Sequence, residues 1–135
     1  MRFPNAELLR AHAKTPLDEV LYLYLGRQNV EVLGGLDACA LLRRLYLQHN
    51  RIERIGGALT PCAHLLHLNL AGNGLTSVAG LLGLRALMTL DASHNLLPDS
   101  ELLQLQALRV VSLSVEGNPG YGDGAAGAAA EARAR

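Results

Sequence analysis

Apolar and polar residues follow one another in a pattern that recurs through most of this chain. The clearest copy reads Leu68-Asn-Leu70-Ala-Gly-Asn73, in which two leucines stand two positions apart and an asparagine follows three positions later. Four of the five copies end in asparagine, and the first ends in glutamine. These amide residues, spaced by 22, 23, 22 and 23 positions, are Gln28, Asn50, Asn73, Asn95 and Asn118.

Each leucine pair predicts a short β-strand, because side chains two positions apart point to the same face of a strand. One such strand cannot bury its leucines alone, whereas stacked copies form a parallel sheet over a continuous apolar column. The apolar residues after each asparagine, such as Leu75 and Val78, are expected to return the chain along the other side. The predicted fold class is α/β: a right-handed solenoid of about five repeats, with the sheet on its concave face and turns and short helices on its convex face.

The amide residue that follows each strand has a predicted structural role. The chain turns there, and its buried backbone groups need hydrogen-bond partners. An asparagine side chain carries two N–H donors and an acceptor, so it can bond to its own turn and to the adjoining one. A ladder of stacked amides is therefore expected inside the solenoid, made of Gln28, Asn50, Asn73, Asn95 and Asn118.

This pattern resembles the leucine-rich repeat, in its class with 22-residue repeats, over about residues 20–119. Within that class the chain is similar to the leucine-rich regulatory subunit of protein phosphatase 1, the leucine-rich light chain of axonemal outer-arm dynein and the spliceosomal A-prime protein. The resemblance implies a non-enzymatic scaffold or regulator that binds another protein. The small number of repeats is closer to the axonemal light chain than to the longer phosphatase regulator, which favours a cytoskeletal or axonemal subunit.

The two ends of the chain depart from the repeat, as the terminal units of a solenoid must. Residues 1–19 are predicted to form an N-terminal cap with a helix that starts after Asn5. Residues 20–119 hold the repeats, and residues 120–135 form a Gly- and Ala-rich tail that is expected to be flexible or partly helical. Asn118-Pro119 resembles the start of the family's C-terminal cap, but the Tyr-Arg-containing helix that usually follows is missing.

Composition and charge narrow the function classes. Twelve basic and twelve acidic residues cancel, so the chain has no bulk attraction for nucleic acid or for membranes. The chain start lacks the apolar run of a signal peptide, and a cytoplasmic location is expected, with the cilium or flagellum axoneme implied by the resemblance. Cys39 and Cys62 occupy equivalent places in neighbouring copies and are expected to be buried thiols rather than a disulfide.

The residues between the paired leucines are expected to face outward and to form the functional surface. They stack into columns about 4.8 Å apart, and the first copies contribute tyrosines and arginines, the residue types that anchor protein interfaces. The net charge also differs between the two halves of the repeat region: residues 20–64 carry +2 and residues 65–119 carry −2. The alternative is that these residues only shield the sheet. The predicted partner-binding strip is Tyr22, Tyr24, Arg44, Tyr46, His67, Asn69 and Asp91.

An enzymatic or metal-binding site is not expected. Asp91, Ser93 and His94 include residue types of a catalytic triad, but serine and histidine fall in different columns and no strained turn presents a nucleophile. His49, His67 and His94 lie one or more repeats apart and in two columns, which makes a poor metal site. No cofactor is expected. Dynein, tubulin or a phosphatase are the partners that the resemblance implies. A permanent structural subunit is the second hypothesis, and an RNA-processing role ranks third because the chain lacks a basic aromatic face.

Overall fold

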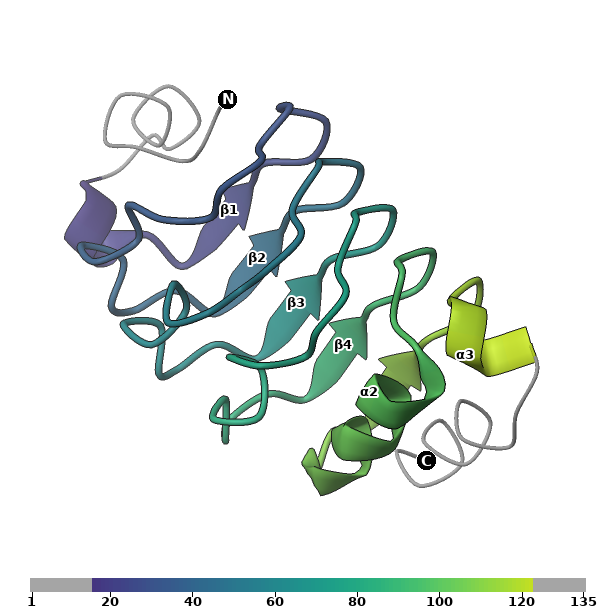
Figure 1. The fold of residues 1–135 in the computed structure, drawn as a ribbon. Helices are drawn as coiled ribbons and strands as arrows, with labels where there is room; N and C mark the ends of the chain where they lie inside the picture. The colour runs from purple at the N-terminus through teal and green to yellow at the C-terminus, as the bar shows by residue number, and fades with distance from the viewer. Residues whose placement is uncertain (1–15, 123–135) are drawn as a thin grey trace.

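The computed structural model describes residues 16–122, and five short strands form its single parallel sheet. Figure 1 shows the strands side by side, with the chain returning between them along one side of the sheet. Each strand is three residues long, which is the length of one outward–inward–outward alternation. The strands, in spatial and sequence order, are β1 (Tyr22–Tyr24), β2 (Arg44–Tyr46), β3 (His67–Asn69), β4 (Thr89–Asp91) and β5 (Ser112–Ser114).

Equivalent residues of successive copies pair across the sheet without a shift in register. Tyr24 pairs with Tyr46, and Asn69 pairs with Asp91. The central leucine of every strand is buried, because it points into the column that the stacked copies enclose. The predicted fold class, a solenoid with a parallel sheet, is therefore confirmed.

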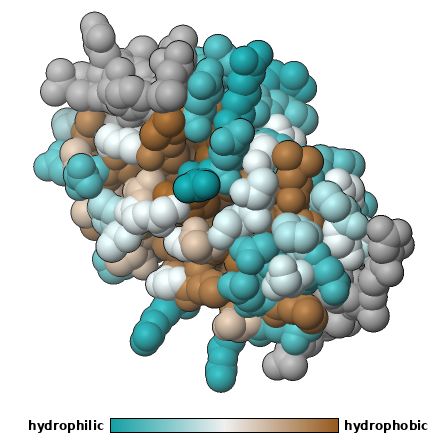
Figure 2. All heavy atoms as spheres, in the orientation of Figure 1, coloured by the Kyte–Doolittle hydropathy of each residue, from teal (hydrophilic) through white to brown (hydrophobic). Residues whose placement is uncertain are grey.

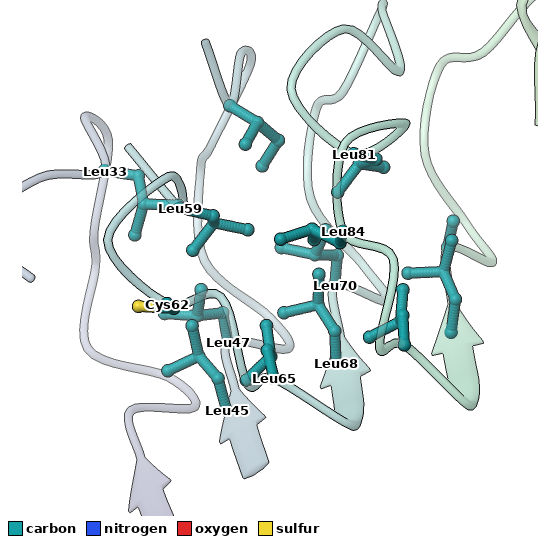
Figure 3. Packing of buried hydrophobic residues seen from close by; sticks show 14 of the residues in the cluster. Leu33, Leu45, Leu47, Leu59, Cys62, Leu65, Leu68, Leu70, Leu81 and Leu84 are labelled. Atoms are coloured by element: carbon teal, nitrogen blue, oxygen red, sulfur yellow. The ribbon is translucent and has the colours of Figure 1, made fainter. Parts of the chain in front are cut away.

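The core of the solenoid is built almost entirely from the leucines of the repeat. Figure 3 shows them in layers, with Leu45 and Leu47 of one copy beside Leu68 and Leu70 of the next. All four side chains are essentially inaccessible to solvent. Burying a leucine side chain contributes about 1.5–3 kcal/mol, so each added copy stabilises its neighbours as well as itself.

The returning segments are mainly turns, and within residues 16–122 an α-helix forms in only one copy between strands. This is α2 (Asp99–Gln104), which starts after Pro98 and continues into the 3-10 turn η2 (Leu105–Ala107). The sequence here contains no glycine, whereas the equivalent segments of earlier copies contain Gly56, Gly57 and Gly80, which disfavour a helix. The expectation of short helices along the convex face therefore holds for the fourth copy alone.

The ends of the described chain contain two further short elements. The 3-10 turn η1 (Leu17–Glu19) precedes the sheet, while the helix predicted after Asn5 lies outside the described residues. At the other end, α3 (Pro119–Gly122) lies against the start of α2, and the Gly120 amide donates to the Leu97 carbonyl. The remainder of the predicted tail is also outside the described range. No helix within residues 16–122 has the length and apolarity needed to cross a bilayer.

Cys39 and Cys62 are both buried, free thiols. Desolvation raises the pKa of each thiol; that of Cys62 rises to about 11, with smaller contributions from the nearby Cys39 and Asp37. Thiolates are the reactive form of cysteine. Both side chains therefore behave as small apolar residues of the core at neutral pH.

The raised thiol pKa values predict a loss of stability in alkali. Unfolded cysteine loses its proton near pH 8.5, whereas folded Cys62 keeps its proton to about pH 11. The unfolded state thus binds fewer protons between these limits, so the free energy of unfolding should fall as pH rises through that window. Urea unfolding at pH 8 and pH 10.5 measures the loss. A Cys62→Ala variant should lose less over the same window, and an equal loss in both proteins would contradict the assignment.

Candidate protein-interaction surface

The asparagine after each strand joins two neighbouring copies. The Asn95 amide donates to the carbonyls of Leu70, Ala92 and Ser93 at 2.9, 3.0 and 3.1 Å. Its side-chain oxygen accepts the backbone N–H of Leu75 at 3.1 Å. One buried side chain therefore satisfies backbone groups of the third and fourth turns at once.

The same arrangement recurs at the other asparagines but not at the first amide residue. Asn50, Asn73 and Asn118 each donate to the preceding copy and accept at least one of its backbone N–H groups. Gln28 donates only a 3.4 Å bond to the Gly26 carbonyl, and its backbone N–H is itself held by the Asn50 oxygen. The ladder in the described residues thus begins at Asn50, because residues 16–27 contain no earlier copy to which the Gln28 side chain could bond.

A second regular feature, which the sequence analysis missed, is the left-handed residue before each amide. His49 and His94 have φ values of 58° and 55°, and Gly72 and Gly117 have 70° and 76°. A Cβ atom on Gly72 would lie 2.6 Å from Nδ1 of His49, and one on Gly117 would collide with His94. Each histidine ring therefore fills the space that the glycine of the next copy leaves open. The alternation of His-Asn and Gly-Asn in the sequence is the signal that could have revealed it.

The tyrosines of the predicted strip lie together on the outer side of β1 and β2. The Tyr24 and Tyr46 rings are stacked, with centroids 4.8 Å apart and planes 5° from parallel. This separation matches the spacing of neighbouring strands, since the two residues are paired in register. The Arg44 guanidinium lies over the Tyr22 ring, 5.4 Å from its centroid. Tyr22 and Tyr24 remain 51% and 59% exposed, so this aromatic group is presented to solvent.

The other residues of the strip lie on β3 and β4 and are tied to the sheet by hydrogen bonds. His67 Nδ1 and Thr89 Oγ1 are 2.7 Å apart. Asn69 accepts the N–H of Ala71 at 3.0 Å, which fixes its side-chain amide. Asp91 accepts the N–H and the hydroxyl of Ser93, the latter at 2.6 Å.

Continued past Ala92, the alternation of the strand would also point Ser93 outward, and the structure corrects this expectation. Its side chain is only 5% exposed, because the hydroxyl turns back to the Asp91 carboxylate instead of pointing to solvent. The polar second half of the concave face is therefore made by side chains of β3, β4 and β5.

A depression of about 280 Å³ lies on this half of the face, and we call it the concave depression. The tall tyrosines of β1 and β2 are followed by short polar side chains, so the surface drops beyond Tyr46. The lining residues are Tyr46, His67, Leu68, Asn69, Thr89, Leu90, Asp91, Ser112 and Ser114. All seven predicted strip residues are thus outer residues of β1–β4 on one continuous sheet surface. Four of them line the depression: Tyr46, His67, Asn69 and Asp91.

Apolar side chains are also exposed away from the strip. Leu96, Leu103 and Val111 are 56%, 47% and 62% exposed. Figure 2 shows the apolar surface in view as separate areas divided by polar residues. Scattered exposure of this kind is ordinary in soluble domains and does not identify a second surface. Residues 16–122 contain no group of three His, Cys, Asp or Glu side chains suited to a metal ion.

Comparison with known proteins agrees with the geometry. A model of the leucine rich repeat matches residues 40–97. The solved structure of internalin C2 from Listeria monocytogenes superposes with a TM-score of 0.64 at 28% identity, covering 76% of this chain and 45% of that one. The class that the fold and surface define is the leucine-rich-repeat solenoid. The chain contains leucine-rich repeats, and the resemblance to the leucine-rich repeat inferred from its sequence is confirmed.

The chain is also similar to part of a larger protein, the alpha subunit of geranylgeranyl transferase type-2. The chain is 33% identical over 103 residues to the human geranylgeranyl transferase type-2 subunit alpha, and 31% identical over 102 residues to that of the rat. The matches cover 75% and 74% of this chain but 18% of either relative. The chain therefore spans under a fifth of the length of the curated relatives that it matches.

Proposed function

We propose that this chain is an interaction module that binds a partner protein through its concave sheet. Leucine-rich repeats are typically non-enzymatic interaction folds. The observation that carries the proposal for this face is the stack of the exposed Tyr24 ring on the half-buried Tyr46 ring.

Physical chemistry supports the tyrosine stack as the anchor of an interface. Each tyrosine offers a large apolar surface with a polar tip, and tyrosine and arginine are enriched among the residues that dominate binding energy. The two rings are already ordered against each other, and Arg44 is held over Tyr22. A partner would therefore lose less side-chain entropy on binding here than on a surface of independent side chains.

The direct test is a double substitution of the stack. A Tyr24→Ala, Tyr46→Ala protein, used as bait in native extract, is expected to lose its principal partner while keeping its circular dichroism spectrum, because both side chains lie on the outer side of the sheet, away from the leucine core. Affinity should fall at least about 30-fold, as expected for two anchor residues. Leu103→Ala is the matched control, because Leu103 is a similarly exposed apolar residue on α2. Retention of the same partner by the double variant would refute the proposal.

A narrower role follows from the prenyltransferase relatives. The 33% identity to the human geranylgeranyl transferase type-2 subunit alpha supports a place in a prenyltransferase-type assembly. In the same pull-down, a prenyltransferase subunit that wild-type protein retains and the double variant loses would support this role. If wild-type protein retains no prenyltransferase subunit, the narrower role is rejected. The dynein, tubulin and phosphatase partners that the sequence resemblance implies are tested by the same comparison.

A further inference from the structure

One wall of the concave depression is an aromatic ring with a single covered face. Tyr24 stacks on one face of Tyr46, and Tyr46 lines the depression beyond. The next residues in the same register are Asn69 and Asp91, which are paired on β3 and β4. Because the side chains of Asn69 and Asp91 are shorter, the uncovered face of Tyr46 looks onto the depression.

The floor of the depression carries one fixed carboxylate. Oδ1 of Asp91 accepts both the backbone N–H and the hydroxyl of Ser93, at 3.0 and 2.6 Å. The other carboxylate oxygen accepts no hydrogen bond from residues 16–122. Asp91 is half-buried, and a carboxylate held in one orientation favours a charged N–H donor.

The spacing of these two groups matches the size of a guanidinium. Tyr46 and Asp91 are two strands apart, which is about 10 Å between their backbones. A planar cation stacked on the ring would lie about 4 Å from it, which leaves about 6 Å to the Asp91 backbone for the carboxylate side chain and one hydrogen bond. Arginine combines stacking on an aromatic face with paired N–H donors for a carboxylate, whereas lysine is a compact point charge.

We propose that the concave depression binds an arginine side chain of the partner protein, with its guanidinium between the uncovered face of Tyr46 and the carboxylate of Asp91. The inference rests on the proposed function, since it specifies what the concave face recognises. Charge agrees with this placement, because residues 65–119 carry a net −2, and Arg44, on the same strand as Tyr46, lies over the Tyr22 ring of β1.

The experiment uses two small probes that differ only in charge. The 15N-labelled chain is titrated with Nα-acetyl-arginine methylamide and with its neutral isostere, Nα-acetyl-citrulline methylamide. The arginine probe should shift the backbone amide signals of Asn69, Asp91 and Ser114 saturably. The citrulline probe should bind about tenfold more weakly, because it lacks the charge that pairs with Asp91 and stacks on Tyr46.

Two variants assign the effect to the depression. Asp91→Asn should remove the difference between the probes, and the fold should persist because asparagine occupies the equivalent place in β3 and holds its turn in the same way. Glu116→Gln is the matched control, since Glu116 is an exposed carboxylate that does not line the depression. The inference would be overturned if the wild-type chain bound the two probes equally. It would also be overturned if Glu116→Gln lost the preference for the arginine probe while Asp91→Asn kept it.

A random twelve-residue peptide library, selected on the immobilised chain, separates failure of this inference from failure of the proposed function. Selected peptides that contain arginine and lose binding to Asp91→Asn support the inference. Peptides that lack arginine and bind the wild-type chain but not the Tyr24→Ala, Tyr46→Ala variant overturn the arginine site and leave the proposed function standing. Peptides whose binding is unaffected by either set of substitutions overturn both.

Discussion

Replacing Asn95 by alanine is expected to lower the free energy of unfolding by about 3–5 kcal/mol. The asparagine amide is nearly inaccessible to solvent and makes four hydrogen bonds to backbone groups. Alanine would leave the Leu75 N–H buried without a partner, which costs about 1–3 kcal/mol, and would remove one of two donors from each of the Leu70, Ala92 and Ser93 carbonyls. Because these groups belong to two copies, the substitution also weakens their mutual stacking.

The matched control for this prediction is Gln28→Ala. Gln28 occupies the equivalent place in the first copy, but its side chain makes a single hydrogen bond of 3.4 Å. Its removal should change the free energy of unfolding by under about 1 kcal/mol. Urea unfolding followed by circular dichroism measures both variants. Similar losses from the two substitutions would show that the amide ladder does not join the copies as described.

Gly80→Ala is expected to destabilise the fold by about 2–4 kcal/mol. Gly80 has a φ of 93°, a conformation that residues with a Cβ atom rarely adopt. An added Cβ would also collide with the Gly56 carbonyl oxygen of the preceding copy and approach the Ile55 side chain to 3.0 Å. The backbones of two copies could no longer come together at this turn.

Gly83→Ala controls for the loss of glycine itself. A Cβ at this position meets nothing within 4 Å and the residue is exposed. Its free energy of unfolding should stay within about 0.5 kcal/mol of the wild-type value. Thermal melts of both variants, measured side by side, give the difference in their stability. A Gly80→Ala protein as stable as Gly83→Ala would show that the two turns do not approach each other so closely.

The repeat allowed most of the fold to be predicted from the sequence. Leu68 and Leu70 must point the same way, and no copy can bury such a pair without its neighbours, so spacing alone predicts stacked parallel strands. The outward direction of Tyr24 and Tyr46 follows from the same alternation. These features depend on a short period repeated many times, which leaves few alternatives.

Other features depend on contacts between copies, which a single copy does not encode. The packing of His49 over Gly72 involves residues 23 positions apart. The burial of Ser93 depends on a local bond to Asp91 that competes with its expected outward direction. The concave depression results from tall side chains on β2 beside short ones on β3 and β4, which became evident only once the register was known.

The register also explains why one face combines two kinds of chemistry. Tyr46 is the last tall residue of its column, so it closes the aromatic stack on one side and borders the depression on the other. A partner that crosses the strands would meet apolar rings first and a carboxylate next. The apolar and charged groups therefore follow one another in a fixed order across the strands, and this order determines the orientation in which a partner binds.

Site-specific photo-crosslinking tests the central claim, that the concave sheet contacts the partner, most directly. A benzoyl-phenylalanine placed at position 24 reports from the tyrosine stack, and one at position 103 reports from the exposed side of α2. Irradiation in native extract should yield a crosslinked partner from position 24 and none from position 103. A partner captured from position 103 alone would contradict the account.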